Sequence, residues 1–288
     1  MFFYVGITNV IFYLNPMRWW RLSKDYGQLY SYIRPYVQKQ ATEMQEKPGA
    51  ANKSMVHHLY ASISNEEGSD EMLQVMSNNR RFLESIIGHI NTFLFAGHDT
   101  TSFTACWVFR DLARYPEVLA RVRAELDAVL GPDASKTSEV LRDTPSLVNS
   151  LLYTNAVIKE SMRLNTNVGS LRKGEAGYFI NVTSDCSSEF EGKQFPTEGF
   201  LLFDGTFGMH RLSTVWHRPT EFLPERYLVK EAADPLYPPR NGWRAFEAGP
   251  RNCIGQNLAV VELKLAVALT VRRFDIECDY EGWDTLIG

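Results

Sequence analysis

The stretch that decides the fold is Phe246-Glu-Ala-Gly-Pro-Arg-Asn-Cys-Ile-Gly255, which reads FxxGxRxCxG and leads into a helical pattern ending near Val271. A thiolate is stabilised at a helix N-terminus and beside a cation, and Cys253 has both, with Arg251 two positions before it. Glycines in such a loop let the backbone come close to a flat ligand. The stretch therefore predicts a ligand-binding cysteine; the alternative is an ordinary buried cysteine in a glycine-rich turn.

A second motif, Glu160-Ser-Met-Arg163, lies on a helix predicted to begin at Pro145. Residues three apart share a helix face, so Glu160 and Arg163 can form a charge-assisted pair. Arg226 follows downstream and offers a second arginine for the same carboxylate. If the carboxylate is buried, removal of any partner leaves a costly unpaired charge. By itself a Glu-x-x-Arg pattern is common in helices and identifies nothing.

A third motif, Ala96-Gly-His-Asp-Thr-Thr101, falls inside a long helix predicted from Asn78 to Leu112. Glycine inside a helix costs about 1 kcal/mol relative to alanine, so Gly97 needs a reason. Such a glycine can open the helix locally and leave a groove for a small ligand. The acid and alcohol of Asp99 and Thr100 can relay protons into that groove. Read alone, the motif better suits a kinked helix whose polar side chains cap its own backbone.

The whole chain predicts a mainly α fold with a small β part. Helices are expected from Pro116 to Gly131 and from about Gly255 to Val271, and strands at 178–182 and 200–203. Polar loops are expected at 45–54, 62–70, 131–145, 183–199 and 228–242. Their Pro, Gly, Ser, Asn and Asp content is typical of turns.

Composition excludes several classes of protein. The 288 residues are 44% hydrophobic, enough for one large or two small domains. The net charge of −4 argues against a nucleic-acid partner, which requires a basic face. The four cysteines form no CxxC pair, so neither a structural zinc site nor a disulfide framework is expected.

The apolar N-terminal segment Phe2–Leu14 allows two interpretations. It is shorter than the roughly 20 residues that a spanning helix needs, and it lacks the positive start of a signal peptide. It is either a buried core segment or an interfacial segment, in which case residues 2–21 contact a membrane surface with Trp19 and Trp20 at the water boundary.

The order and separation of the three motifs resemble the cytochrome P450 family, from about Asn78 to Val271. The resemblance implies the C-terminal, haem-binding portion of that fold, with 78–288 as the haem-binding core and 1–77 as a partial lid and pocket segment. It implies haem b, with an axial thiolate on the iron. The implied roles are iron ligand for Cys253; cofactor contacts for Arg251, Phe246 and Arg172; oxygen-activating protons for Thr100 and Asp99; a structural triad for Glu160, Arg163 and Arg226; and structural roles for His98 and His210.

The resemblance also implies partners and a location. The partners are O₂, an apolar small-molecule substrate and NADPH–cytochrome P450 reductase or a similar electron donor. The location is the cytosolic face of the endoplasmic reticulum membrane, without a spanning helix in this chain. The general character is similar to fungal members of secondary metabolism.

Two departures from the family pattern leave two hypotheses. Where the family usually has a proline after the Glu-x-x-Arg helix, this chain has Leu164-Asn-Thr-Asn-Val168, and only 99 residues precede Thr100. The first hypothesis is an active monooxygenase. The second is an N-terminally truncated homologue with impaired haem binding and no independent catalysis. Because a site without the front half of the fold would be open to water, we expect electron consumption by this chain alone to be uncoupled from product.

Overall fold

The structure is a computed structural model that describes residues 16–46, 80–182 and 189–278. The chain divides into two compact units, 1–96 and 97–288, and the division falls inside helix α5 (Arg80–Arg114). In the first unit the structure describes α2 (Pro16–Glu46) and the start of α5. The predicted apolar segment 2–14 lies outside the described residues. In the part that is described, no helix is both long and apolar enough to cross a membrane.

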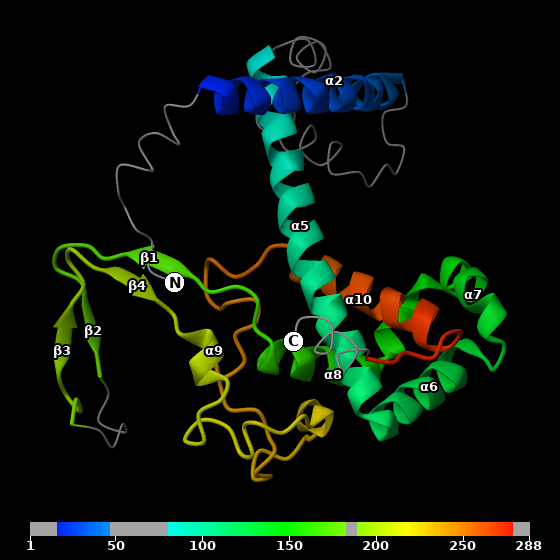
Figure 1. Ribbon diagram of the computed structural model, residues 1–288, viewed down its shortest axis with the longest axis vertical. Helices are drawn as coiled ribbons and strands as arrows, with labels where there is room; N and C mark the ends of the chain where they lie inside the picture. Colours follow the sequence, from blue (N-terminus) through cyan, green and yellow to red (C-terminus); the bar gives the residue numbers. More distant parts are fainter. Residues whose placement is uncertain (1–15, 47–79, 183–188, 279–288) are drawn as a thin grey trace, which may run out of the picture. The chain divides into compact units, whose positions relative to one another are not determined.

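The second unit is mainly helical with a small β part, as predicted (Figure 1). Its helices beyond α5 are α6 (Pro116–Leu130), α7 (Thr137–Asp143), α8 (Leu152–Leu164), α9 (Thr206–Met209) and α10 (Gln256–Val271). Short 3-10 turns cover Ala134–Lys136, Pro145–Ser150 and Pro224–Tyr227.

Helix α6 shows how local signals set boundaries. It begins at Pro116, whose fixed φ suits the first helical position, and it ends before Gly131, which has φ +82°. Four side chains spaced four apart form its buried face: Val118, Val122, Leu126 and Leu130. Both predicted ends of this helix are confirmed, as is the predicted helix that ends at Val271.

The helix predicted to begin at Pro145 is wrong at its start. Pro145 begins a 3-10 turn, Leu151 leaves helical geometry with ψ 75°, and α8 begins only at Leu152. The first turn of α8 is capped from another helix, because the Glu125 carboxylate on α6 accepts the backbone N–H groups of Tyr153 (2.6 Å) and Thr154 (2.8 Å). A cap supplied 28 residues away leaves no local pattern in the sequence.

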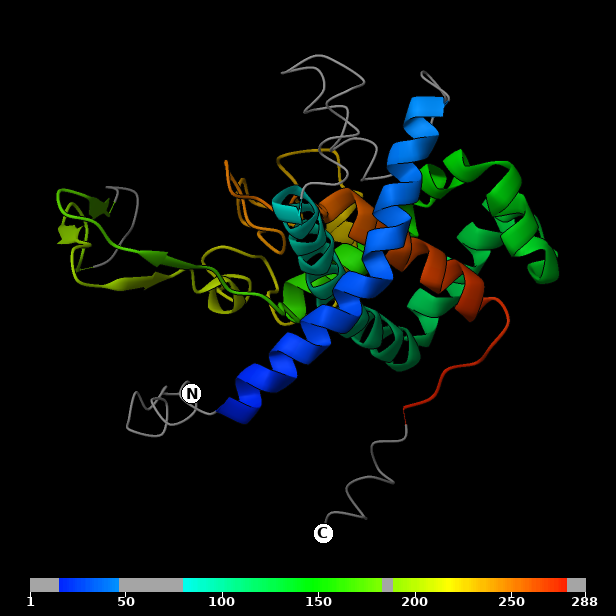
Figure 2. The same cartoon turned by 90° about the horizontal axis from the view of Figure 1, so that it is seen from above.

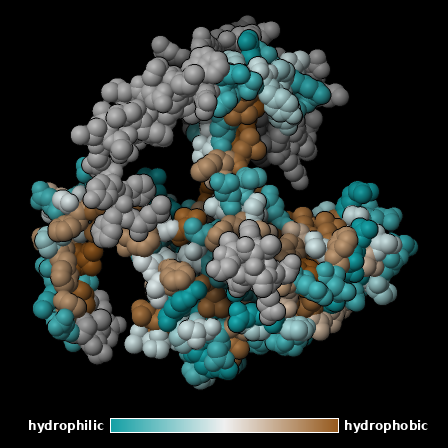
Figure 3. Space-filling view, viewed as in Figure 1, coloured by the Kyte–Doolittle hydropathy of each residue, from teal (hydrophilic) through white to brown (hydrophobic). Residues whose placement is uncertain are grey.

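The strands form two separate antiparallel pairs. β1 (Leu171–Lys173) pairs with β4 (Leu201–Phe203), and β2 (Phe179–Asn181) pairs with β3 (Gln194–Pro196). Both predicted strands are present within the expected ranges. The predicted loops 131–145 and 183–199 are wrong in part, because they contain α7 and β3. Apolar side chains remain exposed on β2 and β3, and Figure 3 shows hydrophobic surface over them.

The core of the second unit lies between the C-terminal part of α5 and helices α6, α8 and α10. It consists of Val108, Leu112, Val118, Val122, Leu126, Leu130, Leu141, Val148, Leu151, Tyr153, Val157, Ile158, Met162, Phe222, Leu263, Val267, Ala268 and Val271. Figures 1 and 2 show the strand pairs at one end of this unit and α6 and α7 at the other. The buried helix α8 thus carries the Glu-x-x-Arg motif in the middle of the unit.

Candidate active site

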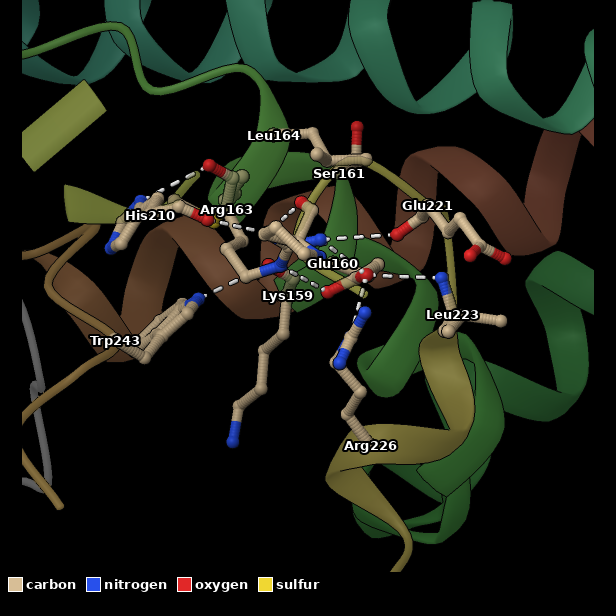
Figure 4. Close-up of polar contacts among 12 residues, drawn as sticks. Lys159, Glu160, Ser161, Arg163, Leu164, His210, Glu221, Leu223, Arg226 and Trp243 are labelled. Carbon is tan, nitrogen blue, oxygen red and sulfur yellow. Dashed lines mark hydrogen bonds and ion pairs between the residues drawn. The ribbon is translucent and has the colours of Figure 1, made fainter. Parts of the chain in front are cut away.

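The structure brings Glu160, Arg163 and Arg226 together, and none of the three side chains has any exposed surface (Figure 4). Glu160 Oε2 accepts from Arg163 Nε at 2.8 Å, and Oε1 accepts from Arg163 Nη2 at 2.8 Å and from Arg226 Nε at 3.1 Å. The backbone N–H of Leu223 also donates to Oε1, at 3.0 Å, and is the fourth donor to the carboxylate. The carboxylate therefore has its hydrogen-bonding capacity filled by two cations and one amide.

Arg163 uses all five of its N–H groups. Besides the two bonds to Glu160, Nη1 donates to the carbonyl oxygens of His210 (2.6 Å) and Pro219 (2.7 Å), and Nη2 donates to that of Glu221 (3.1 Å). This matches the fixed fork of five donors that a guanidinium presents. The triad thus ties the irregular segment 210–223 to α8.

Arg226 holds the same segment from the other side. Its Nη1 donates to the carbonyl of His217 and its Nη2 to that of Arg218 at 2.5 Å. The buried ring of Trp216 lies 5.0 Å from the Arg163 guanidinium carbon and 5.9 Å from that of Arg226, as cation–π contacts. Sequence reasoning missed the carbonyl partners of Arg226, because a backbone carbonyl is the same in every residue and gives no sequence pattern.

His210 connects the triad segment to the cysteine loop, in the structural role that the sequence predicted. Its Nε2 accepts the backbone N–H of Arg244 at 3.0 Å, so its proton is on Nδ1, which donates to the carbonyl of Arg163 at 3.0 Å. Trp243 adds a parallel link, because its Nε1 donates to the carbonyl of Lys159 on α8 at 3.1 Å. Two adjacent residues before the cysteine loop are therefore fixed to α8, one of them through His210.

His210 is expected to make folding sensitive to mild acid. Burial lowers the pKa of this imidazole from 6.5 to about 4. Between pH 6.5 and about pH 4, His210 is protonated in the unfolded chain but neutral in the folded state. The free energy of unfolding therefore falls as the pH drops through this range. The loss is at most about 1.4 kcal/mol per pH unit. The check is the midpoint of urea unfolding between pH 7.5 and 5. His210→Gln, which does not titrate, should show a shallower fall, and parallel curves for the two proteins would contradict the assignment.

The predicted cysteine ligand lies in the loop directly before α10. The Cys253 thiol is exposed, and its backbone N–H donates to the carbonyl of Phe246 at 2.9 Å. Phe246 is half-buried against the core and stacks edge-on with Trp243 at 5.9 Å. Gly249 has φ +81°, a conformation that favours glycine. The motif glycine thus shapes the loop, and the Phe246 contact closes it.

The residues of this loop fit a haem group. The only sulfur donor in the loop is the exposed thiol of Cys253, at the positive end of the 16-residue helix α10. Ile254 and Leu258 beside it are 89% and 59% exposed, which provides apolar contact for a flat macrocycle. Arg251 and Arg172 are exposed cations of the type that pairs with propionates. Arg172 lies on β1, where its Nη1 contacts Ser170 Oγ at 3.3 Å; its contact with haem stays a prediction.

The predicted oxygen-activating residues lie on α5, which stays helical through the motif, without a break. The Asp99 carboxylate is exposed and lies 2.8 Å from Nδ1 of His98. Thr100 is half-buried, and its carbonyl accepts from the side chains of Thr104 (2.8 Å) and Asn167 (2.9 Å). Asn167 was not singled out as a site residue by sequence reasoning.

Comparisons with known proteins identify the family. Residues 4–285 match the family model described as cytochrome P450. The chain is 34% identical to the cytochrome P450 monooxygenase polC of Polytolypa hystricis, over 96% of this chain and 48% of that protein. It is 35% identical to the cytochrome P450 monooxygenase acrF of Aspergillus aculeatus, over 69% of this chain and 42% of that protein. It is also 35% identical to human cytochrome P450 4Z1, over 73% of this chain and 38% of that protein.

A mainly helical fold with an exposed cysteine directly before α10 and a buried Glu–Arg–Arg triad has the features expected of the haem-thiolate class of proteins. The chain belongs to the cytochrome P450 family, which confirms the resemblance, including its similarity to fungal members. It spans about half the length of the curated relatives it matches.

Proposed function

We propose that this protein is a haem-thiolate monooxygenase that inserts one oxygen atom of O₂ into an apolar small molecule. Two electrons from NADPH, delivered by a cytochrome P450 reductase or similar donor, and two protons reduce the other oxygen atom to water. Haem b supplies the O₂-binding and redox chemistry when it is bound. We further propose that it works at the cytosolic face of the endoplasmic reticulum membrane, and that its substrate belongs to fungal secondary metabolism.

The observation that carries the proposal is the exposed Cys253 thiol in a loop anchored to a buried triad. The Arg244–His210 and Trp243–Lys159 hydrogen bonds fix the start of that loop to the triad segment and α8. In this proposal Cys253 binds the iron, Arg251 and Arg172 bind the propionates and Phe246 supports the cofactor. Asp99 and Thr100 would hold and pass on the protons that the reduction of oxygen consumes.

The test is turnover by the purified, haem-loaded protein with NADPH, a reductase and a panel of apolar molecules. Hydroxylated product and hydrogen peroxide are measured in the same reaction, and isotopically labelled O₂ should label the product. Product that carries oxygen from labelled O₂ supports the proposal, also where part of the electrons consumed is recovered as peroxide. Electron consumption that yields peroxide without any product would contradict it and support the second hypothesis, a homologue without independent catalysis.

A further inference from the structure

The turn after α8 departs from the family pattern, and the structure shows what its polar residues do. Asn165 Nδ2 lies 3.4 Å from Asp111 Oδ2 on α5. Thr166 Oγ1 lies 2.9 Å from Nδ1 of His210. Asn167 Nδ2 donates to the carbonyl of Thr100 at 2.9 Å and approaches Thr104 Oγ1 at 3.3 Å. Two asparagines therefore fasten the turn to α5, at two places along the helix.

The carbonyl oxygen of Thr100, which Asn167 contacts, accepts hydrogen bonds from two side chains. In an α-helix the carbonyl of residue 100 faces the N–H of residue 104. Here the same oxygen also accepts from Thr104 Oγ1 at 2.8 Å and from Asn167 at 2.9 Å. The two side-chain donors tie Thr104 and the turn after α8 to the Thr100 carbonyl, so this oxygen anchors both. α5 stays helical through this motif, and Asn167, 67 positions away in the sequence, adds a side-chain donor to the turn.

We propose that Asn167 is a positioning residue for Thr100. Its amide holds the 100–104 turn of α5 in the geometry that aims the Thr100 hydroxyl at the reaction site. This inference rests on the proposed function for the role of Thr100, although the contact itself does not depend on haem. A side chain fixed by packing and hydrogen bonds keeps a proton-relay group in place, and small displacements of such groups lower rates strongly.

Asn165 gives a matched control. It is the same residue type in the same turn and also contacts α5, but at Asp111, about three helical turns beyond Thr100. Asn165→Ala therefore loosens the turn without touching the Thr100 carbonyl. Asn167→Ala removes the Thr100 contact, and Asn167→Asp keeps the size of the side chain while it replaces the donor by an acceptor.

The first measurement is amide hydrogen exchange over residues 98–106 in the protein without haem. We expect exchange there to rise about fivefold in Asn167→Ala, as the loss of a hydrogen bond worth about 1 kcal/mol implies. Asn167→Asp should show the same rise or a larger one, and Asn165→Ala should leave this segment unchanged. Unchanged exchange in both Asn167 variants would contradict the proposal that the Asn167 amide holds the 100–104 turn.

The second measurement is the ratio of hydroxylated product to hydrogen peroxide in the haem-loaded protein. Asn167→Ala should lower this ratio several-fold at unchanged haem content, and Asn165→Ala should not. Faster exchange together with an unchanged ratio would overturn the positioning role. Absence of product from the unsubstituted protein would contradict the proposed function instead. Amide exchange would then still show whether Asn167 holds the 100–104 turn.

Discussion

Glu160→Ala is expected to abolish haem incorporation and to lower the yield of folded protein, although Glu160 lies on α8 and not in the cysteine loop. The substitution leaves the Arg163 and Arg226 guanidinium groups buried without a counter-charge. Breaking a buried ion pair in this way costs roughly 3–5 kcal/mol, a large part of the 5–15 kcal/mol that stabilises a typical domain. The measurements are the midpoint of urea unfolding and the haem content per polypeptide.

Two further variants separate the triad from a general effect of charge. Glu160→Gln keeps an acceptor oxygen for the arginines and should fall between the unsubstituted protein and Glu160→Ala. Glu221→Ala removes an exposed carboxylate paired with Arg218, and should change little, because exposed pairs contribute little to stability. Normal stability and normal haem content in Glu160→Ala would refute the structural role of the triad.

Cys253→Ser should remove the spectral signature of thiolate ligation completely. In the unsubstituted protein, reduction and addition of carbon monoxide should produce the red-shifted Soret band that a thiolate ligand gives. Serine keeps the size of the side chain but supplies no sulfur, so this band should disappear. Because the Cys253 side chain is exposed, the free energy of unfolding of the haem-free protein should change little.

The other described cysteines provide the control. Cys106 and Cys278 are free and exposed, as Cys253 is. Cys106→Ser and Cys278→Ser should therefore keep the red-shifted band. If Cys253→Ser kept the band, the iron ligand would have to be another group, and the assignment of the cysteine loop would be wrong.

Several features could be predicted from the sequence because local chemistry determines them. Pro116 and Gly131 bound α6, since one has a fixed φ and the other tolerates a positive φ. The spacing of Glu160 and Arg163 places them on one helix face wherever that helix lies. The order of glycines, arginine and cysteine before α10 indicated the cytochrome P450 family, and the family match confirms that family. The role of Cys253 as thiolate ligand stays a prediction.

Other features depended on residues far apart in the chain. The start of α8 is set by Glu125 on another helix, and the predicted start at Pro145 was wrong for that reason. The sequence supplied a second arginine for Glu160 but not the backbone carbonyls that fill the remaining donors of Arg163.

The sequence by itself determined the family, the local helix boundaries and the residue types of the candidate site. Only the tertiary structure decided how these residues are held: His210 between α8 and the cysteine loop, and Asn167 on the carbonyl of Thr100. The physical reason is that every residue except proline carries the same backbone donor and acceptor. A contact between a side chain and a distant backbone group therefore has no residue pattern, and it exists only once the chain has folded.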